Sequence, residues 1–215
     1  IIFTLQSPET SLGFLDRFLA CCEAYNIPVL ILFNKIDLLN FEEVELVEEL
    51  QAMYENLGYQ TLQVSSAEKQ NLDKLQEILK DKTCVFFGHS GAGKSTLANA
   101  LQPDLNLKTN EISETHNKGK HTTTFAQMHF WHFGGAVIDT PGVREFAMID
   151  VEKEEIQHYF PEIFEKGREC KFHNCKHINE PKCAVLEALE TGEILESRYI
   201  TYLKLMEEAE EQNQM

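Results

Sequence analysis

The sequence is poor in positive charge, in long apolar runs and in leader-like features. Among its 215 residues, Lys and Arg number 19 and Asp and Glu number 35, which gives a formal net charge of -16. No stretch reaches the roughly 18 to 20 apolar residues that a membrane-spanning helix needs, and the start does not resemble a signal peptide. We therefore expect a soluble cytoplasmic protein that does not bind membranes, and we expect a monomer.

The shortage of Lys and Arg restricts how the chain can bind nucleic acid. Binding over a whole surface depends on basic side chains that neutralise phosphates, so any contact with RNA must be local. The charge balance reverses between Lys166 and Lys182, where Glu169 and Glu180 are the acidic residues. The basic residues of this segment are Lys166, Arg168, Lys171, Lys176 and Lys182. We call it the basic segment.

Strand and helix patterns alternate through the first two thirds of the chain. Residues 1–5 read as a strand with no initiator methionine before it, so we expect further sequence upstream. Apolar periodicity predicts helices near 11–25, 41–57, 72–79 and 94–101, and strands at 28–33, 61–66 and 84–87. This alternation predicts an α/β class with a mostly parallel sheet, whose ligands lie at the carboxyl ends of the strands.

The last third of the chain has a different pattern. A Gly134-Gly135 turn predicts a hairpin between residues 126–133 and 136–139. Past Arg144, short helices and a cluster of Cys and His follow. The length, with 43% hydrophobic residues, allows one α/β domain and a smaller neighbour. We predict two domains, residues 1–148 and 149–215, the second mainly helical.

The strongest motif is GHSGAGKS at residues 88–95, which matches the P-loop pattern between a strand and a helix. In such a loop the glycines let backbone N–H groups point at phosphate oxygens. Lys94 supplies positive charge to the β and γ phosphates, and Ser95 offers a hydroxyl ligand to Mg²⁺. The expected nucleotide contacts are Gly88, His89, Ser90, Gly91, Ala92, Gly93, Lys94, Ser95 and Thr96.

The NKID sequence, from Asn34 to Asp37, indicates which base the site accepts. It follows a predicted strand and resembles the guanine-specificity motif of GTPases. The aspartate of that motif accepts two hydrogen bonds that guanine can donate and adenine cannot, and buried polar groups left unpaired make such rejection strong. By the same resemblance, Lys35 packs along the base, and Ser66 and Ala67 offer backbone N–H groups to the guanine oxygen. Taken alone, NKID is also compatible with a helix-capping turn.

Two further stretches resemble GTPase switch segments. DTPG, from Asp139 to Gly142, resembles the motif that brings an aspartate near Mg²⁺ and a glycine N–H to the γ phosphate. GKHTTT at residues 119–124 resembles the first switch loop, where one threonine hydroxyl coordinates Mg²⁺. The sequence does not choose among Thr122, Thr123 and Thr124, and Thr123 is the working candidate for Mg²⁺ and catalysis. Without its neighbours, a threonine run is usually the start of a strand.

The order of these motifs is permuted. In most GTPases the P-loop comes first, whereas here NKID and the serine pair before Ala67 precede Gly88. A circularly permuted chain can build the same sheet because the segments still end at one edge, and permutation is tolerated when the termini are close. The second switch, DTPGVREF, then leads directly into the C-terminal domain.

The sequence CKFHNCKHINEPKC at residues 170–183 predicts a structural zinc site. Three thiolates and one imidazole, from Cys170, Cys175, His177 and Cys183, form a tetrahedral ligand set with no open position. His173 is a fifth candidate that spacing does not exclude. The alternative is a set of metal-free thiols in a reducing cytosol. We expect no disulfides, because the other three cysteines lie in apolar elements.

The permuted order, GHSGAGKST, GKHTTT, DTPGVREF and CxxxxCxHxxxxxC together resemble the RsgA family over almost the whole chain. The resemblance implies a P-loop GTPase fold with a zinc domain, and GTP or GDP, Mg²⁺ and Zn²⁺ as cofactors. It implies a role late in assembly of the small ribosomal subunit, with slow GTP hydrolysis that the subunit stimulates. It also implies an N-terminal OB-fold that binds RNA, which this sequence lacks.

The family resemblance also bears on catalysis and partners. Val143 stands where many GTPases have a water-orienting glutamine, so hydrolysis should be weak alone. His121 is the family's candidate for orienting water, and its alternative is an exposed loop histidine. We expect Lys94 and Thr123 to assist. The basic segment should contact rRNA phosphates, although a merely solvated patch is the alternative.

Three functions remain open from sequence. The first is a GTPase whose hydrolysis releases it from the ribosome. The second is a nucleotide-gated RNA-binding or ribosome-binding module in which turnover is incidental. The third is an ATP-dependent kinase or ATPase. The first requires that segments scattered between Asn34 and Gly142 converge on one pocket.

Overall fold

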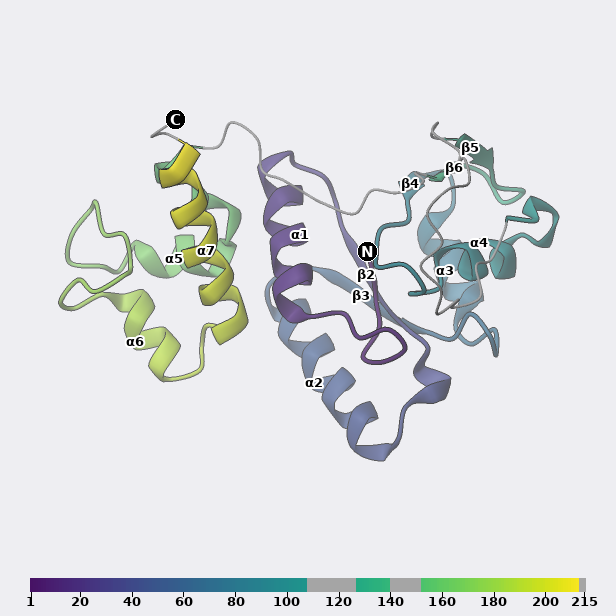
Figure 1. The fold of residues 1–215 in the computed structure, drawn as a ribbon, viewed down its shortest axis with the longest axis horizontal. Coiled ribbons are helices and arrows are strands. Elements are labelled where there is room, and N and C mark those ends of the chain that lie inside the picture. The colour runs from purple at the N-terminus through teal and green to yellow at the C-terminus, as the bar shows by residue number, and fades with distance from the viewer. Residues whose placement is uncertain (108–126, 140–151, 213–215) are drawn as a thin grey trace, which may run out of the picture. The chain divides into compact units, whose positions relative to one another are not determined.

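The computed structural model describes residues 1–107, 127–139 and 152–212, without the side chains of Asp139 and Gln212. The chain falls into two compact units (Figure 1). The first unit comprises Ile1–Thr10 and Leu30–Glu145, and the second comprises Ser11–Val29 and Phe146–Met215. No helix within the described residues is long and apolar enough to cross a membrane.

Three parallel strands form one of the two three-stranded sheets described in the first unit. Their order is β1 (Ile2–Phe3), β2 (Leu30–Asn34) and β3 (Gln60–Val64). Leu32 of β2 is paired with Ile2 on one side and with Leu62 on the other. Four of the five residues of β2 are buried, as expected for a parallel strand covered on both faces.

A second three-stranded group has the order β4 (Thr83–Val85), β6 (Ala136–Asp139) and β5 (Gln127–Phe130). Strands β4 and β6 are parallel, whereas β5 and β6 form the predicted antiparallel hairpin. The Ile2 backbone N–H donates to the Phe87 carbonyl at 2.7 Å, so the chain just past β4 lies beside β1. The predicted mixed α/β class with a parallel sheet is confirmed.

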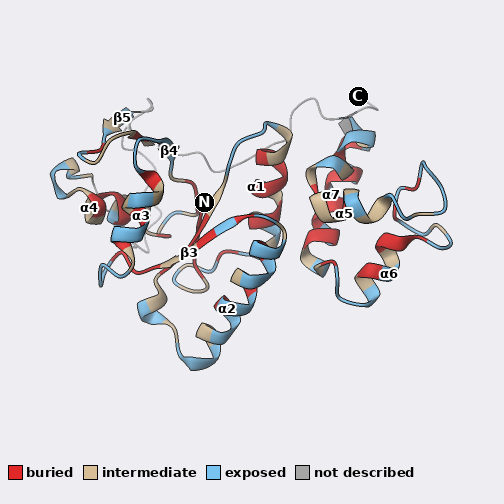
Figure 2. Ribbon diagram, turned by 180° about the vertical axis from the view of Figure 1, so that it is seen from behind, coloured by how far each residue is buried: buried red, intermediate tan, exposed pale blue. Residues whose placement is uncertain are grey.

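The helices of the first unit are α2 (Phe41–Asn56), α3 (Leu72–Leu79) and α4 (Lys94–Leu101), with 3-10 turns η1 (Ile36–Leu38) and η2 (Pro103–Leu105). A capping box formed by Asn40 and Glu43 starts α2. This helix lies against β3, and its outer side is largely exposed (Figure 2). The core shared by sheet and helices contains Ile2, Leu32, Val64, Leu72, Leu75, Leu79, Leu97, Trp131 and Val137.

The second unit is helical. Its elements are α1 (Leu12–Ala24), η3 (Lys153–Tyr159), α5 (Pro161–Gly167), α6 (Ala184–Glu190) and α7 (Glu196–Gln212). Ala20 and Cys21 of α1 belong to the same buried cluster as Ile163, Val185 and Leu205. The predicted domain limits, 1–148 and 149–215, stay a prediction, since they follow sequence order whereas α1 packs with helices beyond residue 152.

Ion pairs reinforce this packing. The fully buried Arg198 of α7 makes two hydrogen bonds to Glu162, at 2.6 and 3.1 Å, and lies 3.8 Å from a carboxylate oxygen of Asp16 on α1. Its guanidinium also lies 4.6 Å from the centre of the Phe160 ring. Removing one partner from such a buried group costs roughly 3–5 kcal/mol, because the other charge is left uncompensated.

Candidate nucleotide site and metal centre

Asn34, the first residue of NKID, joins three of the predicted nucleotide motifs. Its side-chain N–H donates to the carbonyl of Ala92 in the P-loop at 2.9 Å. Its side-chain oxygen accepts from the backbone N–H of Ser66 at 3.2 Å and from the Ser66 hydroxyl at 2.9 Å. Asn34 is 3% exposed, so these bonds lie in the interior. The three motifs therefore meet around one buried amide at the carboxyl end of β2.

The glycines at the two ends of the P-loop make this close approach possible. A Cβ atom at Gly93 would lie 2.4 Å from the side-chain nitrogen of Asn34, and Gly93 has a φ of +102°. A Cβ atom at Gly88 would lie 2.7 Å from the carbonyl oxygen of Ile2. Both contacts are far shorter than van der Waals distance. A side chain at Gly88 would push the loop away from β1, and one at Gly93 would push it away from NKID.

Lys94 is folded back over the P-loop. It begins α4, and its ammonium group donates to the carbonyls of Gly88 at 2.7 Å and His89 at 2.8 Å. This places the positive charge over the loop, and α4, which begins at Lys94, contributes the free backbone N–H groups of its first turn. A helix start with such N–H groups and a fixed ammonium favours phosphate binding.

Asp37, the predicted base-reading carboxylate, is held by a serine. It lies in η1, and one of its oxygens accepts a hydrogen bond from the Ser65 hydroxyl. The Ser65 oxygen accepts in turn from the backbone N–H of Glu68 at 2.9 Å. Asp37 itself is exposed, whereas Ser65 is fully buried. The VSSA sequence predicted a role for Ser66 and Ala67 but not for Ser65, although Ser65 stands directly before them.

Lys35 adopts the left-handed conformation, with a φ of +67°, at the start of η1. Its ammonium group donates to the backbone carbonyl of Ser7. Partial burial lowers the pKa of Lys35, and the nearby charge of Asp37 opposes that shift. The ammonium group is therefore held at the backbone of Ser7, and the packing of the Lys35 stem along the base stays a prediction.

Several predicted residues lie outside the described part of the chain. These are His121, Thr122, Thr123, Thr124 and Gly142. The backbone of Asp139 ends β6, but its side chain is not described. Their roles in Mg²⁺ binding and catalysis stay predictions.

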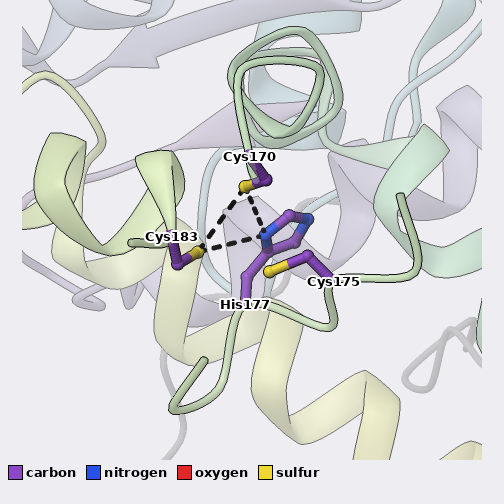
Figure 3. A group of neighbouring side chains, drawn as sticks. All are labelled: Cys170, Cys175, His177 and Cys183. Atoms are coloured by element: carbon purple, nitrogen blue, oxygen red, sulfur yellow. Dashed lines mark hydrogen bonds between the residues drawn. The ribbon is translucent and has the colours of Figure 1, made fainter. Parts of the chain in front are cut away.

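In the second unit, four predicted zinc ligands converge. The ligand atoms of Cys170, Cys175, His177 and Cys183 all lie within 4.8 Å of one another (Figure 3). The Cys170 and Cys183 sulfurs are 3.8 Å apart, and the Nδ1 atom of His177 is 3.6 and 3.3 Å from them. Zinc bonds of about 2.3 Å to sulfur and 2.0 Å to nitrogen give tetrahedral edges of about 3.8 and 3.5 Å. The donor set is therefore compatible with zinc.

These four ligands lie on the loop that joins α5 to α6. Cys170 follows α5, and Cys183 is the residue that caps α6. His173 is exposed and is not part of the group, so the structure selects four of the five candidates. Burial raises the pKa of the Cys175 thiol to about 12 and lowers the pKa of His177. A metal ion would therefore have to displace protons from the thiols as it binds.

The basic segment is partly neutralised. Lys166 is ion-paired with Glu193 at 3.0 Å and with Glu169 at 3.5 Å, and Arg168 with Glu165 at 2.9 Å. Within the part of the chain that the structure describes, no ion pair involves the other basic residues, Lys171, Lys176 and Lys182. Any contact with phosphates would rest chiefly on these three.

Comparison with known proteins adds names to this geometry. The family model described as RsgA GTPase matches residues 1–149. A protein of Christiangramia forsetii named small ribosomal subunit biogenesis GTPase RsgA is 48% identical over 211 residues, which cover 98% of this chain and 67% of that protein. A protein of the same name from Bacteroides fragilis is 49% identical over 211 residues, 98% of this chain and 68% of its own. The chain thus spans about two thirds of the length of these relatives.

Two solved structures have a similar fold. YjeQ from Thermotoga maritima superimposes with a TM-score of 0.82 and 38% identity, over 97% of this chain and 69% of that one. YloQ, described as a circularly permuted GTPase, gives 0.77 and 35% identity, over 99% of this chain and 67% of that one. The predicted permutation of the motifs is confirmed by this likeness.

Proposed function

We propose, from the premise that this chain belongs to the RsgA GTPase family, that it binds GTP with Mg²⁺ and hydrolyses it to GDP and phosphate. We further infer that this reaction serves maturation of the small ribosomal subunit, the process in the names of its relatives. The observation that carries the proposal is the position of Asn34, which hydrogen-bonds both to the P-loop and to Ser66. The elements for base and phosphates are thereby tied together.

The choice of GTP over ATP rests on Asp37. Its carboxylate can accept from both N–H groups on the guanine edge, and Ser65 holds it without burying it. Adenine offers no such pair of donors.

The test of base choice is Asp37→Asn. The amide oxygen can still accept from the ring N–H, but its NH₂ group faces the NH₂ group of guanine, so GDP affinity should fall by about 100-fold or more. Xanthine carries an oxygen at that position, so XDP affinity should rise. Calorimetry with GDP, XDP and ADP measures the three affinities. Equal affinity of the unmodified protein for ADP and GDP would disprove the proposal.

The ribosomal part of the proposal rests on the second unit. Zn²⁺ held by Cys170, Cys175, His177 and Cys183 would keep the intervening loop folded. That loop carries Lys171 and Lys176, with Lys182 at its end, and we expect these side chains to contact rRNA phosphates. Lys171 also lies 5.2 Å from the ring centre of Phe172, which is 41% exposed.

The ribosomal part of the proposal is tested by measuring phosphate release from GTP. We expect small ribosomal subunits to raise multiple-turnover GTP hydrolysis, and we expect replacement of the three lysines by alanine to weaken that rise while leaving the intrinsic rate unchanged. The matched control is Lys74→Ala, an exposed lysine on α3. If subunits bind to the protein but do not change turnover, the binding-module function is correct instead, and hydrolysis is incidental.

A further inference from the structure

The backbone around His177 is held from two directions. On one side is the carboxylate of Glu180, three residues further along the zinc loop. One of its oxygens accepts from the backbone N–H of Lys176 at 2.7 Å, and the other accepts from those of Ile178 at 2.9 Å and Asn179 at 3.1 Å. A single carboxylate therefore binds the N–H groups on both sides of His177.

The carbonyl groups of the same turn are bound by α7. The Tyr199 hydroxyl donates to the carbonyl of His177 at 2.6 Å, and the Tyr202 hydroxyl donates to that of Lys176 at 3.0 Å. Both tyrosines are buried, at 8% and 1% exposure. They pack beside each other, with ring centres 6.2 Å apart, and the ring of Tyr202 lies 6.3 Å from that of His177.

His177 needs such support because its backbone is unfavourable. It has a φ of +57°, in the left-handed region, which costs a residue with a side chain roughly 1–2 kcal/mol. Without the bonds from Glu180 and Tyr199, the turn would relax to a common conformation. The imidazole would then turn, and its Nδ1 atom would leave its position 3.3 Å from the sulfur of Cys183.

The back of the imidazole ring is also restricted. A Cβ atom at Gly167, the last residue of α5, would lie 3.1 Å from both Cε1 and Nε2 of His177. Gly167 thus allows the ring to sit against the helix backbone. The ring thus has α5 behind it, while Glu180 binds the backbone N–H groups of the turn and α7 binds its carbonyls. In this position the imidazole is directed at the three sulfurs (Figure 3).

We propose that Glu180, Tyr199 and Tyr202 are positioning residues for the metal centre, which hold His177 ready for the ion and couple metal occupancy to α7. None of them is a metal ligand. The inference rests on the zinc site of the proposed function and adds to it the groups that set its affinity. Hydrogen-bond partners of metal-ligand side chains typically contribute 10- to 100-fold to metal affinity, and we expect an effect of that order from these backbone partners.

The experiment measures zinc affinity by competition with a chromophoric chelator. Glu180→Gln keeps the shape of the side chain but replaces one acceptor oxygen with a donor, so it loses bonds to the backbone N–H groups of Ile178 and Asn179 or to that of Lys176. We expect its affinity to fall by about 10- to 100-fold. Tyr199→Phe removes one hydroxyl and should act in the same direction with a smaller effect.

Matched controls separate positioning from general loss of stability. Glu187→Gln changes an exposed glutamate of α6, and Tyr159→Phe removes a hydroxyl bonded only weakly to Glu155, at 3.3 Å. Both should keep the zinc affinity of the unmodified protein. A second readout is Co²⁺ in place of Zn²⁺, since its visible ligand-field absorption reports whether the imidazole remains bound. This spectrum should change in Glu180→Gln and not in the controls.

The outcomes distinguish the two proposals. If the unmodified protein binds no zinc, the zinc part of the proposed function fails. If it binds zinc, and Glu180→Gln and Tyr199→Phe bind zinc equally well with an unchanged Co²⁺ spectrum, the positioning role is refuted while the zinc site stands. A lower melting temperature of these variants, equal with and without zinc, would assign them a purely structural role and likewise refute it.

Discussion

Replacing Asn34 with alanine should separate the base-binding and phosphate-binding halves of the nucleotide site. The change removes one donor and one acceptor from a buried position and leaves the Ala92 carbonyl and the Ser66 N–H and hydroxyl without their partner. Each buried group left unsatisfied costs roughly 1–3 kcal/mol. Two or three such groups, partly relieved by water, predict a loss of about 3–5 kcal/mol in the free energy of unfolding.

The same change should weaken nucleotide binding, because the P-loop and Ser66 would no longer be held to NKID. A loss of even about 1.4 kcal/mol in preorganisation corresponds to tenfold in GDP affinity. Urea unfolding measures the stability, and calorimetry on the folded variant measures the affinity. We expect both to fall.

Asn40→Ala is the matched control. It removes another asparagine side chain of the same unit, but one that caps α2 and accepts from the backbone N–H of Glu43 at 3.0 Å. Its loss should cost about 1 kcal/mol in stability and leave GDP affinity unchanged. If folded Asn34→Ala bound GDP as tightly as the unmodified protein, the reasoning that Asn34 unites the site would be refuted.

Two other perturbations act on the second unit. Removal of zinc by a chelator should lower its melting temperature, because Cys175 and Cys183 belong to the buried cluster that also contains Tyr202; an unchanged melting curve would speak against a structural metal. The hydrogen bonds from Arg17 lower the pKa of Glu208 below its usual 4.5, although burial opposes this. The pair of Arg17 and Glu208 therefore stabilises the fold at pH values above the ordinary carboxyl pKa. This stabilisation is lost as the pH falls through the lowered pKa of Glu208 in the folded protein. In urea unfolding between pH 7 and about pH 3, the stability difference between the unmodified protein and Glu208→Gln should shrink, and a constant difference would contradict the ion pair.

Much of the fold could be predicted from sequence because its elements have strong local patterns. The helix predicted near 41–57 is Phe41–Asn56, and the one predicted near 72–79 has those same limits. The Gly134-Gly135 turn joins two strands as expected. Strand limits were less predictable, since a strand ends where its pairing ends. Residues 1–5 supply only two strand residues, and the strand predicted at 84–87 is Thr83–Val85.

The candidate metal ligands were predictable because they lie within 14 residues of one another, at a spacing that soft metal sites share. The groups that support them were not. Glu180 looks like one acid among basic residues, and only the folded turn brings its carboxylate to the backbone around His177. Ser65 was missed for a similar reason, because its role depends on the path of η1. Local patterns identify chemistry, whereas the supporting contacts depend on the tertiary fold.

The packing of α1 with α7 was also beyond prediction from sequence. The amphipathic stripe of α1 shows that one face is buried but does not identify what covers it. Arg17 and Glu208, whose side chains make two hydrogen bonds of 2.7 and 2.5 Å, are 191 positions apart. Complementary charges at such a separation are too common in a sequence with 35 acidic residues to indicate a pair.

The path of α1 has a practical consequence for dissecting this protein. The polypeptide leaves the first unit after Thr10, re-enters it at Leu30 and leaves it again after Glu145. The two units are therefore joined by the main chain at three places. A fragment of residues 149–215 expressed alone would lack α1, so Arg198 would have no Asp16 and Glu208 would have no Arg17 beside it. The fragment to express is one in which residues 11–29 are grafted onto the C-terminal helices through a new linker.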